Sequence, residues 1–268
     1  FVYWIREREN IRLKKEAGLP KPWTKDPILQ KYRFCNVRRM DDKVSQWLLQ
    51  NWYQPNYGHK NMLVACALAR QFNNVDALTA IGFPFRWNPI RIKQVLNSRQ
   101  SQGLKNFNPA YMITGRAQRG SKVDQVVDCF LGSLYALRIK SDTSSMKTAW
   151  KQIVGLPGLG SFLAGQTIAD LRWAMPGVWR DRFLWAPMGN GSRRCVNLFL
   201  GKETDGPLYE DEFFDVLRHA IQFCKKNLTE SIASRLEAID YQNCLCEFGK
   251  YERARLGERQ PKQLYQGV

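Results

Sequence analysis

The chain has 268 residues, of which 41 are Lys or Arg and 24 are Asp or Glu, so its formal net charge is +17. This length allows one large domain or two small ones whose core needs no disulfide bonds. A charge of this size favours a polyanionic partner, nucleic acid before an anionic membrane. No segment is apolar over the length of a transmembrane helix and no signal-peptide pattern opens the chain, so the sequence predicts no membrane partner.

Seven cysteines are present without a Cys-x-x-Cys pair, and the two histidines lie far apart in the sequence. A structural zinc site needs three or four ligands at regular spacing, so no metal site is predicted. The odd number of cysteines and their mostly apolar neighbours indicate reduced thiols in a cytosolic environment.

Apolar residues recur mostly at helical spacing and strand-like alternation is scarce, so the sequence predicts an all-α fold. A rigid Pro-rich linker is expected at 20–27 (PKPWTKDP), and the polar tail 257–268 is expected to be loosely held. In chain order, the predicted helices cover 2–17, a segment from Asp41 or Asp42 to Tyr53, 59–72, 75–81, 89–99, 121–138, 144–154, 162–173, 193–200, 209–226 and 229–251.

The turn LPGLG at 156–160 separates two of these predicted helices. Gly158 and Gly160 allow a tight turn and the close approach of another molecule, and the first amides of the next helix, from Ser161, can bind a phosphate. A helix, this turn and an Ala-rich helix form the pattern of the helix-hairpin-helix DNA-binding element. An ordinary turn between two helices is the alternative interpretation, because many such turns contain glycine.

The stretch between Asp76 and Asp124 contains no acidic residue. Basic side chains suit phosphates and exposed aromatic faces can stack on unpaired bases, so we expect a nucleic-acid-binding face here. A solvated basic surface over core aromatics is the alternative. The basic residues are Arg86, Arg91, Lys93, Arg99, Lys105, Arg116, Arg119 and Lys122, and the interleaved aromatic residues are Phe83, Phe85, Trp87, Phe107 and Tyr111.

From the hairpin onward the chain resembles the helix-hairpin-helix DNA glycosylases, so the expected fold is a glycosylase-like helical scaffold with extra terminal segments. The catalytic Asp of that pattern falls at Asn190, and the catalytic Lys of its bifunctional members falls at Phe162. Neither an amide nor a phenyl ring can perform those reactions. Asp181 aligns only after a shift of nine residues, so a glycosylase that excises a base is kept as an alternative.

Three segments carry a closer resemblance: YWIRERENIRLKKEAGLPKPWTKDPILQKYRFCNVRRMDD near the N-terminus, GSRRCVNLFLG in the middle and DYQNCLCEFGKYERARLGERQPKQLY near the C-terminus. Together they resemble the bacteriophage α-glutamyl/putrescinyl-thymine pyrophosphorylases, also described as amino-acid:DNA transferases. This family is related to the helical domain attached to 5-hydroxymethyluracil DNA kinases. The resemblance covers residues 3–265.

The resemblance implies a phage enzyme in the cytoplasm of the infected host. It would displace pyrophosphate from 5-(pyrophosphoryloxymethyl)uracil in DNA with an amine: glycine, glutamate or putrescine. Its partners would be DNA containing modified uracil, the amine and the pathway kinase. No G-x-x-x-x-G-K-[ST] motif occurs, so kinase chemistry by a P-loop is excluded for these residues. A non-catalytic DNA-binding partner of such a kinase is the second alternative.

Such a reaction needs cations for the leaving pyrophosphate, a base for the amine and hydrogen bonds to the uracil edge. The segment NVRRMDD supplies all three within seven residues. We expect Asn36 to bind the uracil, Arg38 and Arg39 the pyrophosphate or a DNA phosphate, and Asp42 to act as the base, with Asp41 as a second candidate. Helix capping by Asp42 and surface positions for the arginines are the alternatives.

The C-terminal helix supplies a second group of candidates. Glu247 is a catalytic candidate, while Gln242, Asn243 and Lys250 are substrate-binding candidates. Asn243, Glu247, Lys250 and Tyr251 would share one helix face, although a Glu247–Lys250 ion pair of no consequence is the alternative.

Further matches to the family pattern lie outside these two segments. Trp23 can stack on a base or simply pack, and Asp26 matches beside it. Ser192, Arg193 and Arg194 open a helix and are DNA-binding candidates, as are Arg116 and Arg119. Addition of Cys35 to uracil C6 is a minor possibility.

The expected organisation has four parts. These are an N-terminal motif segment (1–58) packed on the core, a helical core (59–205) containing the hairpin at 150–171, C-terminal helices that complete the site (206–256), and a basic tail (257–268). No cofactor is required by the sequence, although a monovalent or magnesium ion could sit at the hairpin or accompany the pyrophosphate.

Overall fold

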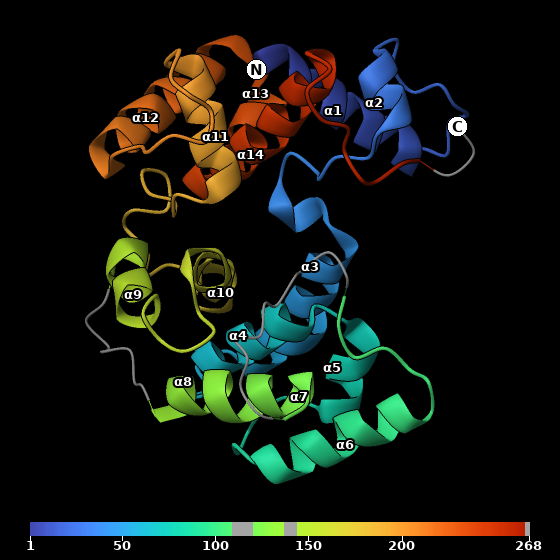
Figure 1. The fold of residues 1–268 in the computed structure, drawn as a ribbon, viewed down its shortest axis with the longest axis vertical. Coiled ribbons are helices and arrows are strands. Elements are labelled where there is room, and N and C mark those ends of the chain that lie inside the picture. The colour runs from blue at the N-terminus through green and yellow to red at the C-terminus, as the bar shows by residue number, and fades with distance from the viewer. Residues whose placement is uncertain (109–119, 137–143, 266–268) are drawn as a thin grey trace. The chain divides into compact units, whose positions relative to one another are not determined.

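The computed structural model describes residues 1–108, 120–136 and 144–265, and in these ranges the chain is helical (Figure 1). The described residues contain no strand beyond a single antiparallel bridge between Tyr32 and Leu264. The all-α prediction is therefore confirmed for the described residues. The chain divides into two units, 1–42 with 183–268 (unit 1) and 43–182 (unit 2).

Unit 1 joins the two ends of the sequence. Its helices are α1 (Val2–Glu16), α2 (Pro27–Lys31), η1 (Arg39–Asp41), α11 (Asn190–Phe199), α12 (Glu210–Asn227), α13 (Glu230–Ala233) and α14 (Ala238–Arg255). Helix α14 is largely buried and packs most extensively against α11. A Cβ atom on Gly191 would lie 2.1 Å from Cys246 Sγ, and one on Gly249 would lie 3.2 Å from Cys195 Cβ. Glycine at both crossing points therefore lets the two helices approach closely.

Unit 2 is built around a helix that is buried along its whole length, α4 (Met62–Phe72). Its other elements are α3 (Lys43–Leu48), η2 (Leu49–Tyr53), η3 (Gln54–Asn56), α5 (Val75–Ile81), α6 (Pro89–Ser101), α7 (Lys122–Asp124), η4 (Gln125–Leu131), α8 (Gly132–Ala136), α9 (Met146–Ile153) and α10 (Ser161–Ala174). Helix α4 packs mainly on α10.

A buried ion pair fixes the α4–α10 contact of unit 2. Arg70 Nε and Nη2 donate to the Asp170 carboxylate at 2.5 and 2.9 Å, and the Tyr53 hydroxyl donates to Asp170 Oδ2 at 2.6 Å. Arg70 also donates to Ser45 Oγ and Asn73 Oδ1. The charged groups are thus paired and hydrogen-bonded, as burial requires. Burial raises the pKa of Tyr53, which keeps its hydroxyl protonated as the donor.

Several predicted boundaries are corrected by the structure. The helix predicted over 229–251 is two helices, α13 and α14, because Asp240 Oδ2 accepts the backbone amide of Glu237 and starts a new helix. The short helix α2 follows directly on the predicted linker, since Asp26 Oδ1 accepts the amides of Ile28 and Leu29. The segment predicted as one helix over 121–138 contains the π-helical stretch η4. The glycosylase-like scaffold and the four-part organisation stay predictions.

Candidate functional site

The NVRRMDD segment and α14 meet within unit 1. The backbone amide of Arg39 donates to Asp240 Oδ1 at 2.9 Å, across 201 positions of sequence. The backbone amide of Cys35 donates to Glu247 Oε2 at 3.1 Å, across 212 positions. Two of the three segments that carry the sequence resemblance therefore form one surface.

Asp41 lies at the centre of an arginine cluster. Its side chain is 7% exposed, and Arg12 Nε, Arg235 Nη2 and Arg38 Nη1 lie 3.3, 2.9 and 3.6 Å from its carboxylate. Burial raises the pKa of Asp41, although Arg12 and Arg235 act against this rise. The carboxylate is already engaged by guanidinium groups, so this geometry suits a positioning role for Asp41. Arg38, Arg235 and Glu9 border a shallow hollow beside it.

Three other polar side chains of NVRRMDD differ in their surroundings. Asn36 holds the segment together, because its oxygen accepts from Arg8 Nη2 at 2.6 Å and its amide donates to the carbonyl of Asp41 at 2.7 Å. Asp42, in contrast, has an exposed side chain, and Arg38 is 36% exposed. Asp42 and Arg38 are therefore the members of this segment that a ligand can reach most directly.

On α14, Glu247 is buried and pairs with Lys250. Partial burial lowers the pKa of Lys250, but the Glu247 carboxylate outweighs this effect and the net pKa is raised. Gln242 Nε2 donates to Ser192 Oγ at 3.0 Å. Asn243 is half-buried, and its side chain makes no hydrogen bond to any residue that the structure describes. Of the four polar candidates on α14, Asn243 is thus the one whose side chain has no hydrogen-bond partner among the described residues.

The start of α11 contacts the same helix. The Ser192 hydroxyl is buried, accepts the amide of Gly189 at 3.1 Å and donates to the Gly189 carbonyl. It therefore stabilises the helix start and is not presented to a ligand. Arg193 Nη1 donates to the carbonyls of Asp205 and Gly206, and Arg194 pairs with the Asp205 carboxylate. As whole residues, both arginines are partly exposed.

Trp23 and Asp26 hold the N-terminal segment in place. Trp23 Nε1 donates to the Leu19 carbonyl at 2.7 Å, and its ring packs edge-to-face on Tyr265 at 5.5 Å. Asp26 accepts from the Tyr251 hydroxyl at 2.7 Å while capping α2. These contacts favour the packing interpretation of Trp23.

Counted over all its atoms, Cys35 is an exposed residue. Desolvation of the thiol and the nearby Glu247 carboxylate nevertheless raise the pKa of Cys35 to about 12. The protein environment thus keeps the thiol protonated and does not favour its addition to uracil.

The hairpin forms a turn between α9 and α10 in unit 2. Gly158 adopts φ +71°, the Leu159 side chain is buried, and its amide donates to the Leu156 carbonyl at 3.0 Å. Gly160 is the N-cap residue of α10 and makes no side-chain cap, and a Cβ atom added to it would meet nothing within 4 Å. The turn is as predicted, whereas DNA binding by it stays a prediction.

The Asp181 side chain accepts hydrogen bonds at the start of α9. Its oxygens accept the amides of Met146 and Lys147 at 2.7 and 3.0 Å and the Ser145 hydroxyl at 2.8 Å. The carboxylate therefore caps α9, which removes support for Asp181 as a glycosylase catalytic residue.

The predicted basic and aromatic face lies in unit 2, but Arg116, Arg119 and Tyr111 fall outside the described residues. His59, Phe83 and Phe85 form a ring cluster with centroid distances of 5.0–5.4 Å, and Phe85 is 57% exposed. Phe107, in contrast, stacks on Phe72 at 4.8 Å. Among the described aromatic residues of this stretch, Phe85 is the one most available to a base.

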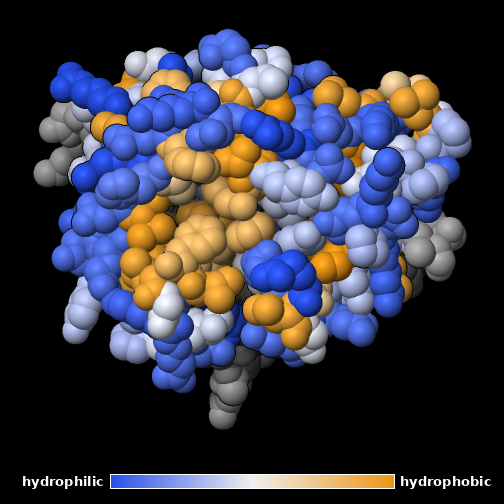
Figure 2. All heavy atoms as spheres, turned by 90° about the horizontal axis from the view of Figure 1, so that it is seen from above, coloured by the Kyte–Doolittle hydropathy of each residue, from blue (hydrophilic) through white to orange (hydrophobic). Residues whose placement is uncertain are grey.

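Two further findings concern the whole described chain. Within residues 1–108, 120–136 and 144–265, no group of three or more His, Cys, Asp or Glu side chains is arranged to hold a metal ion. No helix in these ranges is long and apolar enough to cross a bilayer. Figure 2 shows one face on which apolar side chains gather in a shallow hollow bordered by hydrophilic residues.

Sequence reasoning missed Arg8, Arg12 and Arg235, the residues that hold Asn36 and Asp41. Arg8 and Arg12 stand four positions apart on α1 inside the matching N-terminal segment, so helical spacing could have paired them. Arg235 lies in the interruption between α13 and α14, and nothing in its local sequence signals the contact.

Fold and site together define a basic protein, helical in its described residues, whose two chain ends pack into one polar, arginine-rich cluster. The chain belongs to the family described as "5-hmdU DNA kinase, helical domain", whose model matches residues 1–260. It is 25% identical over 211 residues to a protein of Bacillus phage SP10 named "5-hmdU DNA kinase". That alignment covers 69% of this chain and 33% of the phage protein, so the chain spans about a third of the length of this curated relative. No solved structure matches the chain significantly.

Proposed function

We propose that the protein acts in the hypermodification of thymine in phage DNA, as a transferase that replaces pyrophosphate on 5-(pyrophosphoryloxymethyl)uracil with an amine. The observation that carries the proposal is the junction of NVRRMDD with α14 in a member of the 5-hmdU DNA kinase helical-domain family. These residues contain no P-loop motif, so they would act on the product of a kinase reaction.

The proposed step breaks the bond between the CH2 carbon and the pyrophosphate oxygen and forms a bond from that carbon to the amine nitrogen. Pyrophosphate leaves with the electron pair, and the amine gives one proton to a base. The exposed Asp42 carboxylate is our choice for the base, and the partly exposed Arg38 guanidinium is our choice to bind pyrophosphate. The uncommitted amide of Asn243 suits reading of the uracil edge. Reaching the base inside a duplex would require flipping it out.

DNA contacts would come from both units. In unit 1 Arg193 and Arg194 would bind phosphates, and in unit 2 the hairpin turn at Gly158 and Gly160 and the exposed ring of Phe85 would approach the nucleic acid. The net charge of +17 supports such binding and predicts a strong dependence on salt.

A non-catalytic DNA-binding partner of a kinase is the second candidate. The observation in its favour is that two of the three carboxylates considered for catalysis, Asp41 and Glu247, are already paired with basic side chains. Under this alternative the polar surface would be structural, and the chain would only present DNA to a separate enzyme.

Mass analysis of digested nucleosides separates the two candidates. Hydroxymethyluracil DNA, pyrophosphorylated by the cognate kinase, is incubated with the protein and a mixture of amino acids and polyamines. A new nucleoside with the mass of thymidine plus one amine substituent supports the transferase and identifies the amine. Unchanged pyrophosphorylated nucleoside, with DNA binding intact, would refute the transferase and leave the binding partner.

The variants Asp42→Asn and Arg38→Ala test the assigned roles. Each is expected to abolish transfer, because it removes the proposed base or the proposed pyrophosphate ligand. Each should weaken DNA binding only a few-fold, because neither residue is buried and the fold should be retained. Asp215→Asn, an exposed carboxylate on α12, is the matched control and should leave transfer unchanged. Parallel loss of binding and transfer in Arg38→Ala would make Arg38 a DNA anchor instead.

A further inference from the structure

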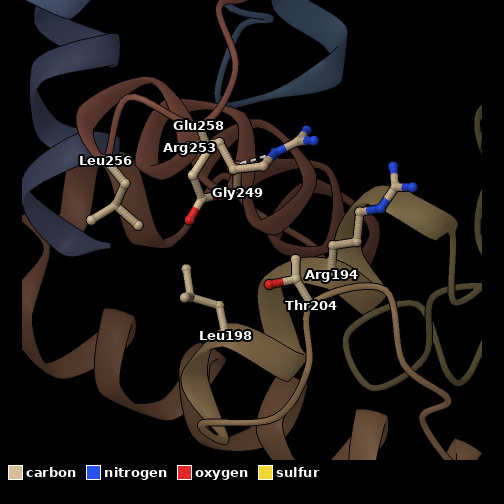
Figure 3. Close-up of a pocket in the computed structure, with 7 residues that line it drawn as sticks. All are labelled: Arg194, Leu198, Thr204, Gly249, Arg253, Leu256 and Glu258. Atoms are coloured by element: carbon tan, nitrogen blue, oxygen red, sulfur yellow. Dashed lines mark hydrogen bonds between the residues drawn. The ribbon is translucent and has the colours of Figure 1, made fainter.

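A second, shallow hollow of unit 1 lies where α14 passes α11 (Figure 3). It combines arginine side chains with an apolar wall. Its lining residues are Arg194 and Leu198 from α11, Thr204 from the loop that follows, Gly249 and Arg253 from α14, and Leu256 and Glu258 beyond it.

Arg253 is held in an orientation that leaves its outer nitrogens available. Its Nε donates to the Gly249 carbonyl one helical turn earlier, at 3.3 Å. Among the described residues, no acceptor pairs with either terminal nitrogen of Arg253. Figure 3 shows the guanidinium groups of Arg253 and Arg194 at the rim of the hollow, on the same side and extending away from Leu198 and Leu256. A guanidinium fixed at Nε with two free N–H edges is suited to grip an oxyanion.

Arg194 pairs with an exposed carboxylate that an incoming anion can displace. Its partner Asp205 has a side chain that is 66% exposed and stands on a loop. The hydrogen bond from Arg194, with the charges of Arg193 and Arg253 adding to it, lowers the pKa of Asp205. Three guanidinium groups therefore act on this one carboxylate. The other acidic group at the hollow is Glu258, whose residue is exposed.

We propose that the rim of this hollow, on the side of Arg253 and Arg194, binds a phosphate oxyanion. Arg253 is the principal ligand, Arg194 exchanges Asp205 for the incoming oxygens, and the Thr204 hydroxyl adds a donor. The wall of Leu198 and Leu256 gives an adjoining sugar an apolar surface. The phosphate belongs either to the DNA backbone or to free pyrophosphate. This inference rests on the DNA-phosphate contact proposed above for Arg194 and deepens it, and it requires no reaction at the base.

Two variants and a matched control test the site. Arg253→Gln removes the charge of the principal ligand, and Asp205→Asn removes the competing carboxylate. Arg255→Gln is the control, since Arg255 lies on the same helix, is exposed and pairs with Glu252. Binding of inorganic pyrophosphate is measured by calorimetry. Binding of an unmodified DNA duplex is measured by fluorescence anisotropy from about 50 to about 200 mM salt.

Arg253→Gln should weaken binding of at least one of the two ligands about tenfold, and Arg255→Gln should change it less than about twofold. Asp205→Asn should increase the affinity for the same ligand about two- to fivefold, a gain that a misfolded variant would not show. Weaker binding of pyrophosphate alone would identify free pyrophosphate as the ligand. Weaker binding of DNA, with the slope of log affinity against log salt concentration reduced by about one, would identify a contact to the DNA backbone.

Equal affinities of Arg253→Gln and Arg255→Gln for pyrophosphate and for DNA would overturn the proposal. Neither ligand carries the modified base, so this result is independent of whether the protein proves to be a transferase.

Discussion

The carboxylate of Glu247 accepts the backbone amide of Cys35 through Oε2, while its Oε1 pairs with Lys250 on the next turn of α14. Glu247 thereby fixes the start of the NVRRMDD segment against the C-terminal helix. Its side chain is 5% exposed, whereas that of Lys250 is 44% exposed, so the pair is buried on one side only.

Glu247→Gln should destabilise the protein by about 1–3 kcal/mol, because the amide can still accept from Cys35 but leaves Lys250 without its counter-charge. The measurement is urea unfolding at neutral pH. Asp215→Asn, which removes an exposed ion pair with Arg218, should cost less than about 0.5 kcal/mol. Equal effects of the two substitutions would show that the charge pairing of Glu247 with Lys250 adds nothing to stability.

The buried network of unit 2 gives a second prediction. Asp170→Asn should cost about 3–5 kcal/mol, because it leaves the Arg70 guanidinium buried without a counter-ion. Tyr53→Phe removes only one neutral donor to the same carboxylate and should cost about 1–2 kcal/mol. Urea unfolding of both variants measures the difference. A cost for Asp170→Asn no larger than that for Tyr53→Phe would show that the ion pair adds nothing beyond the hydrogen bond.

The α11–α14 crossing predicts a coupled pair of substitutions. Gly191→Ala should cost about 1–3 kcal/mol, because its Cβ would lie 2.1 Å from Cys246 Sγ. In a Cys246→Ala background the cost of Gly191→Ala should fall by at least about 1 kcal/mol, since the sulfur is gone and the nearest contact is 3.2 Å. A double-mutant cycle by thermal or urea unfolding tests this, and strict additivity would rule the contact out as the cause.

Buried thiols predict a loss of stability in alkaline solution. Burial raises the pKa of Cys195 and of Cys224 to about 12. The unfolded chain deprotonates near pH ~8.5, so the stability from each protonated thiol is complete below that pH and is lost as pH rises toward 12. Each thiol should lower the free energy of unfolding by about 1.4 kcal/mol per pH unit between about pH 9 and 11.

The free energy of unfolding of wild type and Cys224→Ala, measured in urea from pH 7 to about 10.5, checks this loss. The variant should show the shallower alkaline decline, whatever its stability at pH 7. Parallel pH profiles would mean that Cys224 ionises alike in the folded and unfolded chain.

The hairpin supplies a prediction about DNA. Gly160→Ala adds a Cβ atom in open space at φ −63°, so stability should change by less than about 1 kcal/mol. If phosphates approach the first turn of α10, the same methyl group should weaken DNA binding several-fold. Gly155→Ala, also in open space, is the control and should leave binding unchanged. Anisotropy with a labelled duplex compares them, and identical affinities would exclude close approach at Gly160.

Local sequence was sufficient for most helices. Helix α5 has the predicted bounds. Helix α12 begins with three acidic residues and has two lysines in its last turn, as its sequence predicts. The signals involved are periodicity, caps and end charges, all of which act within one or two turns. The break between α13 and α14 was missed because the Glu237–Asp240 cap lies inside an otherwise helical pattern.

The sequence by itself therefore determined the helical class, the positive charge and the two terminal segments whose pattern resembles a phage DNA-modification family. Only the tertiary structure decided which of their side chains are engaged. Arg235 closes on Asp41 across 194 positions and Arg70 on Asp170 across 100, contacts that leave no trace in local spacing. Burial and pairing of a charge depend on what the whole fold brings beside it. For that reason Asp41 and Glu247 are held within the protein, while Asp42 is exposed and Arg253 is partly exposed.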